Sequence, residues 1–215
     1  MNRSFLVLVS CILFFSCNNK SREERKSDTL INDSTPSTSV DIVEEPSLHR
    51  KFEAKGGIVF EIVSDSDQLS IITKGLEKGM DTIKIAIDGA INNIITTDLD
   101  NNGFSEIYCF CSSAGSGSYG QLYAYASNRN KSLSGIYLPE IEDDAKLSDG
   151  YMGHDSFRIQ KNRLIRSFPI YKETDPNAAP SGGIREISYQ LKEGEAGWVL
   201  KQDTVIEIKQ SVVQQ

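Results

Sequence analysis

Apolar residues recur along most of the chain in short runs that are rich in β-branched and aromatic side chains. Runs of about four to eight such residues, bounded by glycine or Asp/Asn clusters, are typical of β-strands. Asp88-Gly89, Asn101-Asn102-Gly103 and Gly182-Gly183 suit the hairpin connections between them. The expected strands are 58–63, 69–73, 82–87, 91–97, 106–111, 122–126, 134–138, 157–160, 164–168, 184–191, 198–202 and 205–209.

No segment sustains helical periodicity for three turns, and the chain has no internal repeat. Many short strands joined by close turns predict an all-β fold. We expect an antiparallel two-sheet β-sandwich, with a closed antiparallel barrel as the alternative. The length of 215 residues leaves room for one domain of ordinary size, which we place at 48–215.

The first residues predict an export signal. Arg3 precedes an apolar stretch over 5–15, which has the length of a secretory signal core. The stretch ends in Ser16-Cys17, a small residue before a cysteine, which resembles the bacterial lipoprotein processing box. We therefore expect 1–16 to be a signal peptide and Cys17 to be lipidated, anchoring the protein in the bacterial cell envelope, in the periplasm or at the outer membrane. The alternative is a plain signal peptide in which Cys17 is incidental.

Residues 18–47 are polar and charged and include Pro36 and Pro46. Such a composition buries too little surface to offset the entropy of ordering the chain. With Cys17, we expect 17–47 to be a disordered tether that holds the domain on the order of 30 Å from the membrane.

The balance of charges narrows the class of partner. Lys and Arg number 23 against 30 Asp and Glu, for a formal charge of −7, and loss of Arg3 with the signal peptide makes it −8. An acidic protein is a poor ligand for nucleic acid phosphates and a better one for a cationic partner. With two histidines and four cysteines, a His-rich metal site or a multi-disulfide framework is not expected.

Cys109 and Cys111 stand two residues apart on an expected strand, so both point to one face with Ile107, while Tyr108 and Phe110 point to the other. Two cysteines at this spacing lie at or beyond the limit of disulfide geometry. They are best interpreted as small buried hydrophobic residues rather than as metal ligands.

The segment 98–106 alternates oxygen-bearing side chains in the way that a tight calcium loop does. Asp98, Asp100, Asn102 and Glu106 take positions 1, 3, 5 and 9, and Gly103 takes position 6. The position-12 glutamate and the flanking helices of an EF-hand are missing. An ordinary polar hairpin turn is the alternative.

His154 and Asp155 stand beside Ser156, which raises the possibility of a serine nucleophile with a histidine base. No Gly-x-Ser-x-Gly elbow accompanies them. A structural role for these residues is the simpler interpretation.

The most distinctive segment is 112–120, Ser-Ser-Ala-Gly-Ser-Gly-Ser-Tyr-Gly, between two expected strands. Small residues on both sides of Tyr119 predict a protruding loop with an aromatic tip, a good shape for filling a partner's cleft. A Gly-rich phosphate loop is disfavoured because no lysine or helix follows.

Ser116-Gly117-Ser118-Tyr119 resembles the loop of bacterial periplasmic lysozyme inhibitors. An ordered set of further segments, over roughly 98–200, is similar to the inhibitors of invertebrate-type (i-type) lysozyme. This set comprises 114–120, Ile136-Tyr137-Leu138-Pro139, Gly150-Tyr151-Met152-Gly153-His154-Asp155, Phe168-Pro169-Ile170-Tyr171, Asp175-Pro176-Asn177-Ala178-Ala179-Pro180 and Gly194-Glu195-Ala196-Gly197-Trp198.

The resemblance implies an inhibitor of an i-type lysozyme that has no catalytic activity and needs no cofactor. It implies that Ser116, Gly117, Ser118 and Tyr119 enter the lysozyme cleft and that a basic residue makes a second contact. Lys131 is the candidate for that contact, and Arg129 competes with it. Tyr151, Gly153, His154 and Asp155 would position the loops.

Two other functions stay open. One is a calcium-dependent glycan-binding lipoprotein, in which Tyr119 stacks on a sugar and the 98–106 loop holds the ion. The other is an envelope hydrolase that uses His154 and Asp155. The sequence also leaves open whether the domain forms a homodimer.

Overall fold

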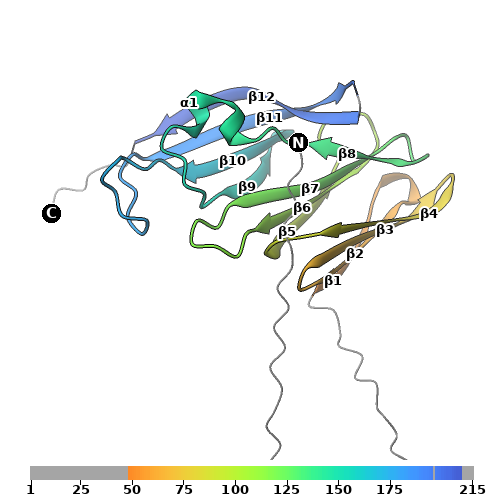
Figure 1. Ribbon diagram of the computed structural model, residues 1–215. Coiled ribbons are helices and arrows are strands. Elements are labelled where there is room, and N and C mark those ends of the chain that lie inside the picture. Colours follow the sequence, from red (N-terminus) through yellow and green to blue (C-terminus); the bar gives the residue numbers. More distant parts are fainter. Residues whose placement is uncertain (1–47, 196, 210–215) are drawn as a thin grey trace, which may run out of the picture. The chain divides into compact units, whose positions relative to one another are not determined.

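The computed structural model describes residues 48–195 and 197–209. The expected signal peptide, the lipidated Cys17 and the 17–47 tether lie outside the described residues. The described chain is all-β with two sheets, as the strand pattern predicts (Figure 1). No helix among the described residues has the length and apolar character needed to cross a membrane.

Four consecutive strands form the smaller sheet in the order β1-β2-β3-β4. They are β1 Leu48–Glu53, β2 Val59–Asp65, β3 Gln68–Leu76 and β4 Gly79–Ala86. Strand β1 was not predicted, because only Leu48 and Phe52 of its six residues pack against the core. An edge strand with so few apolar positions gives little period-2 signal in the sequence.

Eight strands form the larger sheet in the order β5-β6-β7-β8-β12-β11-β10-β9, which curls into a half-barrel (Figure 1). They are β5 Ala90–Thr97, β6 Glu106–Ser112, β7 Gly120–Ser127, β8 Leu133–Tyr137, β9 Ser156–Gln160, β10 Arg163–Pro169, β11 Ile184–Gly194 and β12 Gly197–Ile208. The sheet is two antiparallel meanders joined by a parallel pairing of β8 with β12, at Ile136 with Trp198. The expectation of a wholly antiparallel arrangement is therefore wrong at this one pairing. The barrel alternative also fails for the described strands, because β5 and β9 remain open edges.

Strand β12 corrects a second expectation, since the sequence predicted two strands, 198–202 and 205–209. The polar residues between them form a bulge within one continuous strand. Tyr189 of β11 pairs with Gln202 and Ser188 pairs with Thr204, so Asp203 is the extra residue. Its carboxylate accepts hydrogen bonds from Arg163 and Gln190, which explains why a charged residue interrupts the apolar pattern.

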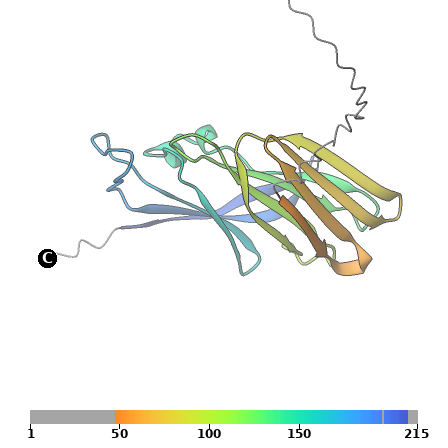
Figure 2. The same ribbon diagram turned by 90° about the horizontal axis from the view of Figure 1, so that it is seen from below.

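Two hydrophobic clusters form the core, and β6 belongs to both. Ile107 and Cys109 pack with the small sheet, which covers one face of β5–β7 (Figure 2). Tyr108 and Phe110 pack on the inner side of the curled sheet. The predicted division of β6 into two faces is confirmed, and Cys109 and Cys111 are buried free thiols. The described members of both clusters lie within 48–209, so a chain that begins at residue 48 contains all of them.

Three short helical turns complete the described fold: η1 Lys55–Gly57, η2 Ile141–Asp143 and α1 Ala145–Ser148. Ile141 and Leu147 point from η2 and α1 into the cluster inside the curled sheet. The connection between β8 and β9 thus covers this core and leads the chain to the segment that contains Tyr151 and Asp155.

Candidate functional site

The loop between β6 and β7, residues 113–119, is closed at its base by its own hydrogen bonds. The Ser113 amide donates to the Tyr119 carbonyl at 2.9 Å, and the Tyr119 amide donates to Ser113 Oγ at 2.9 Å. Nearer the tip, the Ser118 amide donates to the Gly115 carbonyl at 3.0 Å. The side chain of Ser116 is at the exposed tip, and Tyr119 is 43% exposed. The loop therefore presents one hydroxyl and one aromatic ring from a fixed backbone.

Two other segments hold this loop from the side. The His154 amide donates to the Gly117 carbonyl at 2.6 Å. Asn177, in the connection between β10 and β11, donates from its side-chain nitrogen to the Ser116 carbonyl at 3.2 Å. The His154 ring lies 3.4 Å from the Asn177 side-chain oxygen, which joins the two supporting segments to each other. Three segments that are distant in the sequence thus form one cluster, which we call the loop cluster: 113–119, 150–155 and 175–182.

A buried carboxylate anchors the loop cluster to the sheet. One oxygen of Asp155 accepts from the Gly120 amide and the Tyr151 hydroxyl, both at 2.7 Å, and the other accepts from Arg166 Nε at 2.7 Å. The side chains of Asp155 and Arg166 are 0% and 3% exposed. Burial alone lowers the pKa of Arg166, but the hydrogen bond and charge of Asp155 raise it above its ordinary value. The pair is buried, and both oxygens of the Asp155 carboxylate have hydrogen-bond donors, so the contact fixes the geometry of both side chains.

Aromatic rings in edge-to-face contact link the loop to the core. Tyr119 packs edge-on against Tyr151 with centroids 5.6 Å apart, and Tyr151 packs against the buried Phe168 at 4.6 Å. Arg166 also donates to the Tyr151 hydroxyl at 2.7 Å. Burial raises the pKa of Tyr151, so its hydroxyl keeps its proton and remains a donor to Asp155. The Tyr119 ring is thus held in place by Tyr151, and 43% of the residue remains exposed.

These contacts connect Tyr151, His154 and Asp155 with the 113–119 loop or its base, and Gly153 lies close to the Gly117 carbonyl. They also bring in Arg166 and Asn177, to which the sequence reasoning gave no role. A single arginine inside the apolar run of β10 was a usable signal, because a buried charge requires a partner. Asn177 carried no such signal, since its contact with Ser116 spans 61 residues of sequence.

Lys131 does not lie beside the loop. It is exposed in the turn 128–132, which follows the far end of β7 from residue 119 (Figure 1). Eight strand residues separate the two ends of β7, which corresponds to about 26 Å at 3.3 Å per residue. Arg129 shares this turn, so neither basic residue adjoins the tip that carries Ser116 and Tyr119.

His154 and Asp155 do not form a catalytic pair. Both Asp155 oxygens are used by Arg166, Tyr151 and the Gly120 amide. The His154 ring stacks on Tyr171, with centroids 6.1 Å apart, and meets Asn177 rather than Asp155. In a catalytic triad the carboxylate orients the histidine, and here it orients an arginine.

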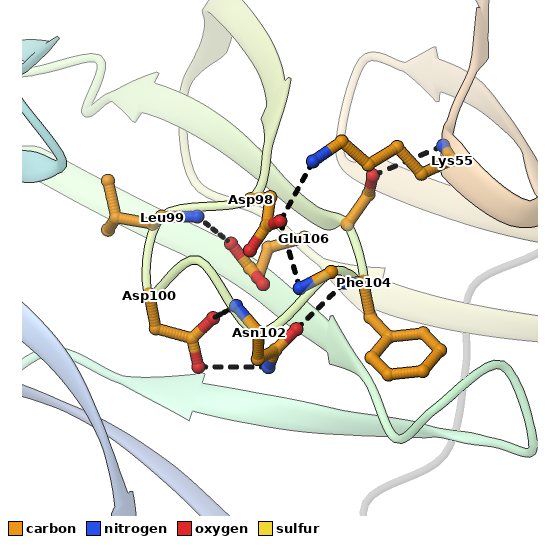
Figure 3. A network of polar contacts seen from close by, with 9 residues as sticks. Lys55, Asp98, Leu99, Asp100, Asn102, Phe104 and Glu106 are labelled. Atoms are coloured by element: carbon orange, nitrogen blue, oxygen red, sulfur yellow. Dashed lines mark hydrogen bonds and ion pairs between the residues drawn. The ribbon is translucent and has the colours of Figure 1, made fainter.

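The acidic loop between β5 and β6 brings three of its four predicted residues together (Figure 3). Carboxylate oxygens of Asp98, Asp100 and Glu106 all lie within 4.8 Å of one another. The fourth, Asn102, instead donates from its side chain to Asp100 at 2.9 Å and accepts from the Phe104 amide at 2.8 Å.

Glu106 is the buried member of this acidic group, and its carboxylate accepts from the Leu99 amide at 2.7 Å. Burial raises the pKa of Glu106 to about 8, and the neighbouring Asp100 and Asp98 add to the effect. Burial also raises the pKa of Asp100. The three carboxylates are thus costly to ionise together without a positive charge beside them.

The acidic loop and Tyr119 lie at opposite ends of β6, about 23 Å apart for seven strand residues. One sugar cannot stack on Tyr119 and touch an ion in the acidic loop. A hollow of about 590 Å³ does adjoin that loop. Its lining includes Asp100, Phe104 and Trp198.

Comparisons with protein-family models, curated proteins and solved structures find no match to this chain.

Proposed function

We propose that this protein inhibits an i-type lysozyme by inserting the 113–119 loop into the enzyme's active-site cleft. The observation that carries the proposal is the preorganised loop. Tyr119 stands at its base, 43% exposed, with its backbone hydrogen-bonded to Ser113 and its ring packed edge-on against Tyr151. A loop already fixed in its bound shape loses little conformational entropy on binding. Tyrosine on such a loop supplies a large contact area with few rotatable bonds.

The chemistry of the tip suits a glycosidase cleft. These enzymes hold a pair of carboxyl groups across the scissile bond. The hydroxyls of Ser116 and Tyr119 can donate hydrogen bonds to such groups, and bonds to ionised carboxylates are stronger than neutral ones. The formal charge of −7 would also speed association with a cationic enzyme. The protein itself performs no catalysis in this proposal.

Lipidation of Cys17 would place the inhibitor in the cell envelope, where it shields peptidoglycan. Cleavage before Cys17 and acylation of its thiol are testable by mass spectrometry of the protein extracted from bacterial membranes.

The test is the lysis of peptidoglycan by an i-type lysozyme, with and without a chain of residues 48–215. We expect stoichiometric inhibition by the parent, and weaker inhibition by Ser116→Ala/Tyr119→Ala with unchanged folding. Lys84→Ala, at an exposed position of β4 in the smaller sheet, serves as the matched control, and Lys131→Ala tests the second basic contact that the resemblance implies. If a micromolar excess of the parent leaves lysis unchanged, the proposal fails for this class of lysozyme.

A second candidate function is favoured by the hollow beside the acidic loop, whose lining includes Trp198 and Phe104. Aromatic rings next to carboxylates could hold a glycan there. This alternative predicts calcium-dependent retention on peptidoglycan, loss of retention in Trp198→Ala, and no effect on any lysozyme.

A further inference from the structure

We propose that Asp98, Asp100 and Glu106 bind one calcium ion at the start of β6. Calcium bonds oxygen at 2.3–2.6 Å, so two ligand atoms on one ion lie at most about 5 Å apart. The three carboxylates meet this limit, since their ligand atoms lie within 4.8 Å of one another. The three separations are therefore compatible with one ion shared by all three side chains.

An unpaired oxygen points to a missing ligand. Asp98 is only 8% exposed at its side chain, and its Oδ1 atom is buried without a hydrogen-bond partner. Its Oδ2 atom is satisfied by Lys55 Nζ and the Gly103 amide, both at 3.0 Å. Figure 3 shows the unpaired oxygen on the side of Asp98 that faces Glu106. A buried carboxylate oxygen without a partner costs free energy, and a cation among the three carboxylates would supply its partner.

The one cation that contacts the group approaches a single member of it. Lys55 Nζ lies 3.0 Å from Asp98 Oδ2, and its side chain is 65% exposed. Among the described residues, no lysine or arginine is ion-paired with Asp100 or Glu106. A cation bound between the three carboxylates would supply positive charge there.

The donor set selects calcium among divalent ions. All three side chains offer oxygen, which suits calcium and magnesium and not the thiolate- and imidazole-binding metals. Magnesium requires a near-ideal octahedron at shorter distances, whereas calcium accepts the irregular geometry of three carboxylates on one turn completed by water.

The ion would stabilise a loop at which three strands of the larger sheet meet. Leu99, within the loop, belongs to the cluster inside the curled sheet, and the Ser105 carbonyl accepts from the Ser127 amide at the end of β7. The loop thus touches β5, β6 and β7 together. Calcium binding would stabilise the folded state, because the unfolded chain does not hold the three carboxylates together.

The test uses residues 48–215 and needs no lysozyme, so it is independent of the inhibitor proposal. Urea unfolding is measured in EDTA, in calcium and in magnesium. At free calcium of 100 times Kd we expect the ratio of folded to unfolded protein to rise about 100-fold. Asp100→Asn should remove this response, while the control Asp81→Asn, on the exposed face of β4, should keep it.

Terbium, a luminescent substitute for calcium, gives a second measurement. The Tyr108 hydroxyl lies 3.4 Å from Glu106 Oε2, so tyrosine excitation should produce terbium emission that calcium displaces and Asp100→Asn abolishes. Equal stability in EDTA and calcium together with absent terbium emission would overturn the proposal. Stabilisation by magnesium alone would overturn the choice of ion.

Discussion

Replacing Asp155 by asparagine tests the anchor beneath the loop cluster. The substitution keeps the shape of the side chain but removes its charge, which leaves Arg166 buried at 3% exposure without a counter-ion. Breaking a buried pair from one side typically costs about 3–5 kcal/mol. We expect the free energy of unfolding to fall by that amount. The control is Asp203→Asn, which breaks an ion pair with Arg163 whose side chains are both 35% exposed and should cost at most about 1 kcal/mol.

Urea unfolding of residues 48–215 measures both variants, with the fluorescence of Trp198, the sole tryptophan, as the signal. An unchanged dependence of the free energy on urea would show that the difference lies in stability rather than in the amount of surface exposed. If Asp155→Asn loses no more stability than Asp203→Asn, the anchor role of the buried pair is refuted. Undiminished inhibition by Asp155→Asn would also contradict it, because the pair acts by holding the loop.

Three further predictions follow from single contacts. Gly117→Ala should weaken lysozyme inhibition at least tenfold, since the new carbon would lie 2.5 Å from the Tyr119 ring, whereas Gly115→Ala meets nothing within 4 Å and should inhibit normally. Hydrogen bonds from Lys74 and His49 lower the pKa of Glu61 to about 2, so its stabilisation is present above the ordinary value of 4.5 and is lost as the pH falls toward 2. Glu61→Gln should therefore flatten stability across that pH range in urea titrations. Burial raises the pKa of Cys109 to about 12, so in the 48–215 chain iodoacetamide at pH 8 should modify the thiol only after urea unfolds the protein, and rapid modification of the folded chain would contradict this burial.

The strands could be predicted because burial follows the period of the backbone. Strand β11 alternates buried and half-buried positions along Ile184–Leu191, and β6 is a continuous apolar run because both of its faces are covered. The bulge at Asp203 reads in the sequence as a break between strands, because an extra polar residue interrupts the pattern in the same way as a turn does.

The pairing of β8 with β12 could not be predicted, because the apolar pattern of a strand does not determine which other strand it pairs with. For the candidate site, too, the residues could be predicted from the sequence, whereas their contacts with distant segments could not. The tip residues Ser116 and Tyr119 stand out by composition, and the spacing of the acidic loop identifies its carboxylates. The contact of Asn177 with Ser116 and the unpaired Oδ1 of Asp98 depend on how distant segments meet, which sequence spacing does not encode.

Strand β6 couples the unfolding of the two hydrophobic clusters, because it contributes side chains to both. Because its side chains fill both clusters, neither sheet can open without exposing one of its faces to water. The domain should therefore unfold as one cooperative unit, with the amide hydrogens of β6 among the slowest to exchange with solvent. The same strand ends at the acidic loop on one side and at the Tyr119 loop on the other, so both loops are attached to the strand that the two clusters share.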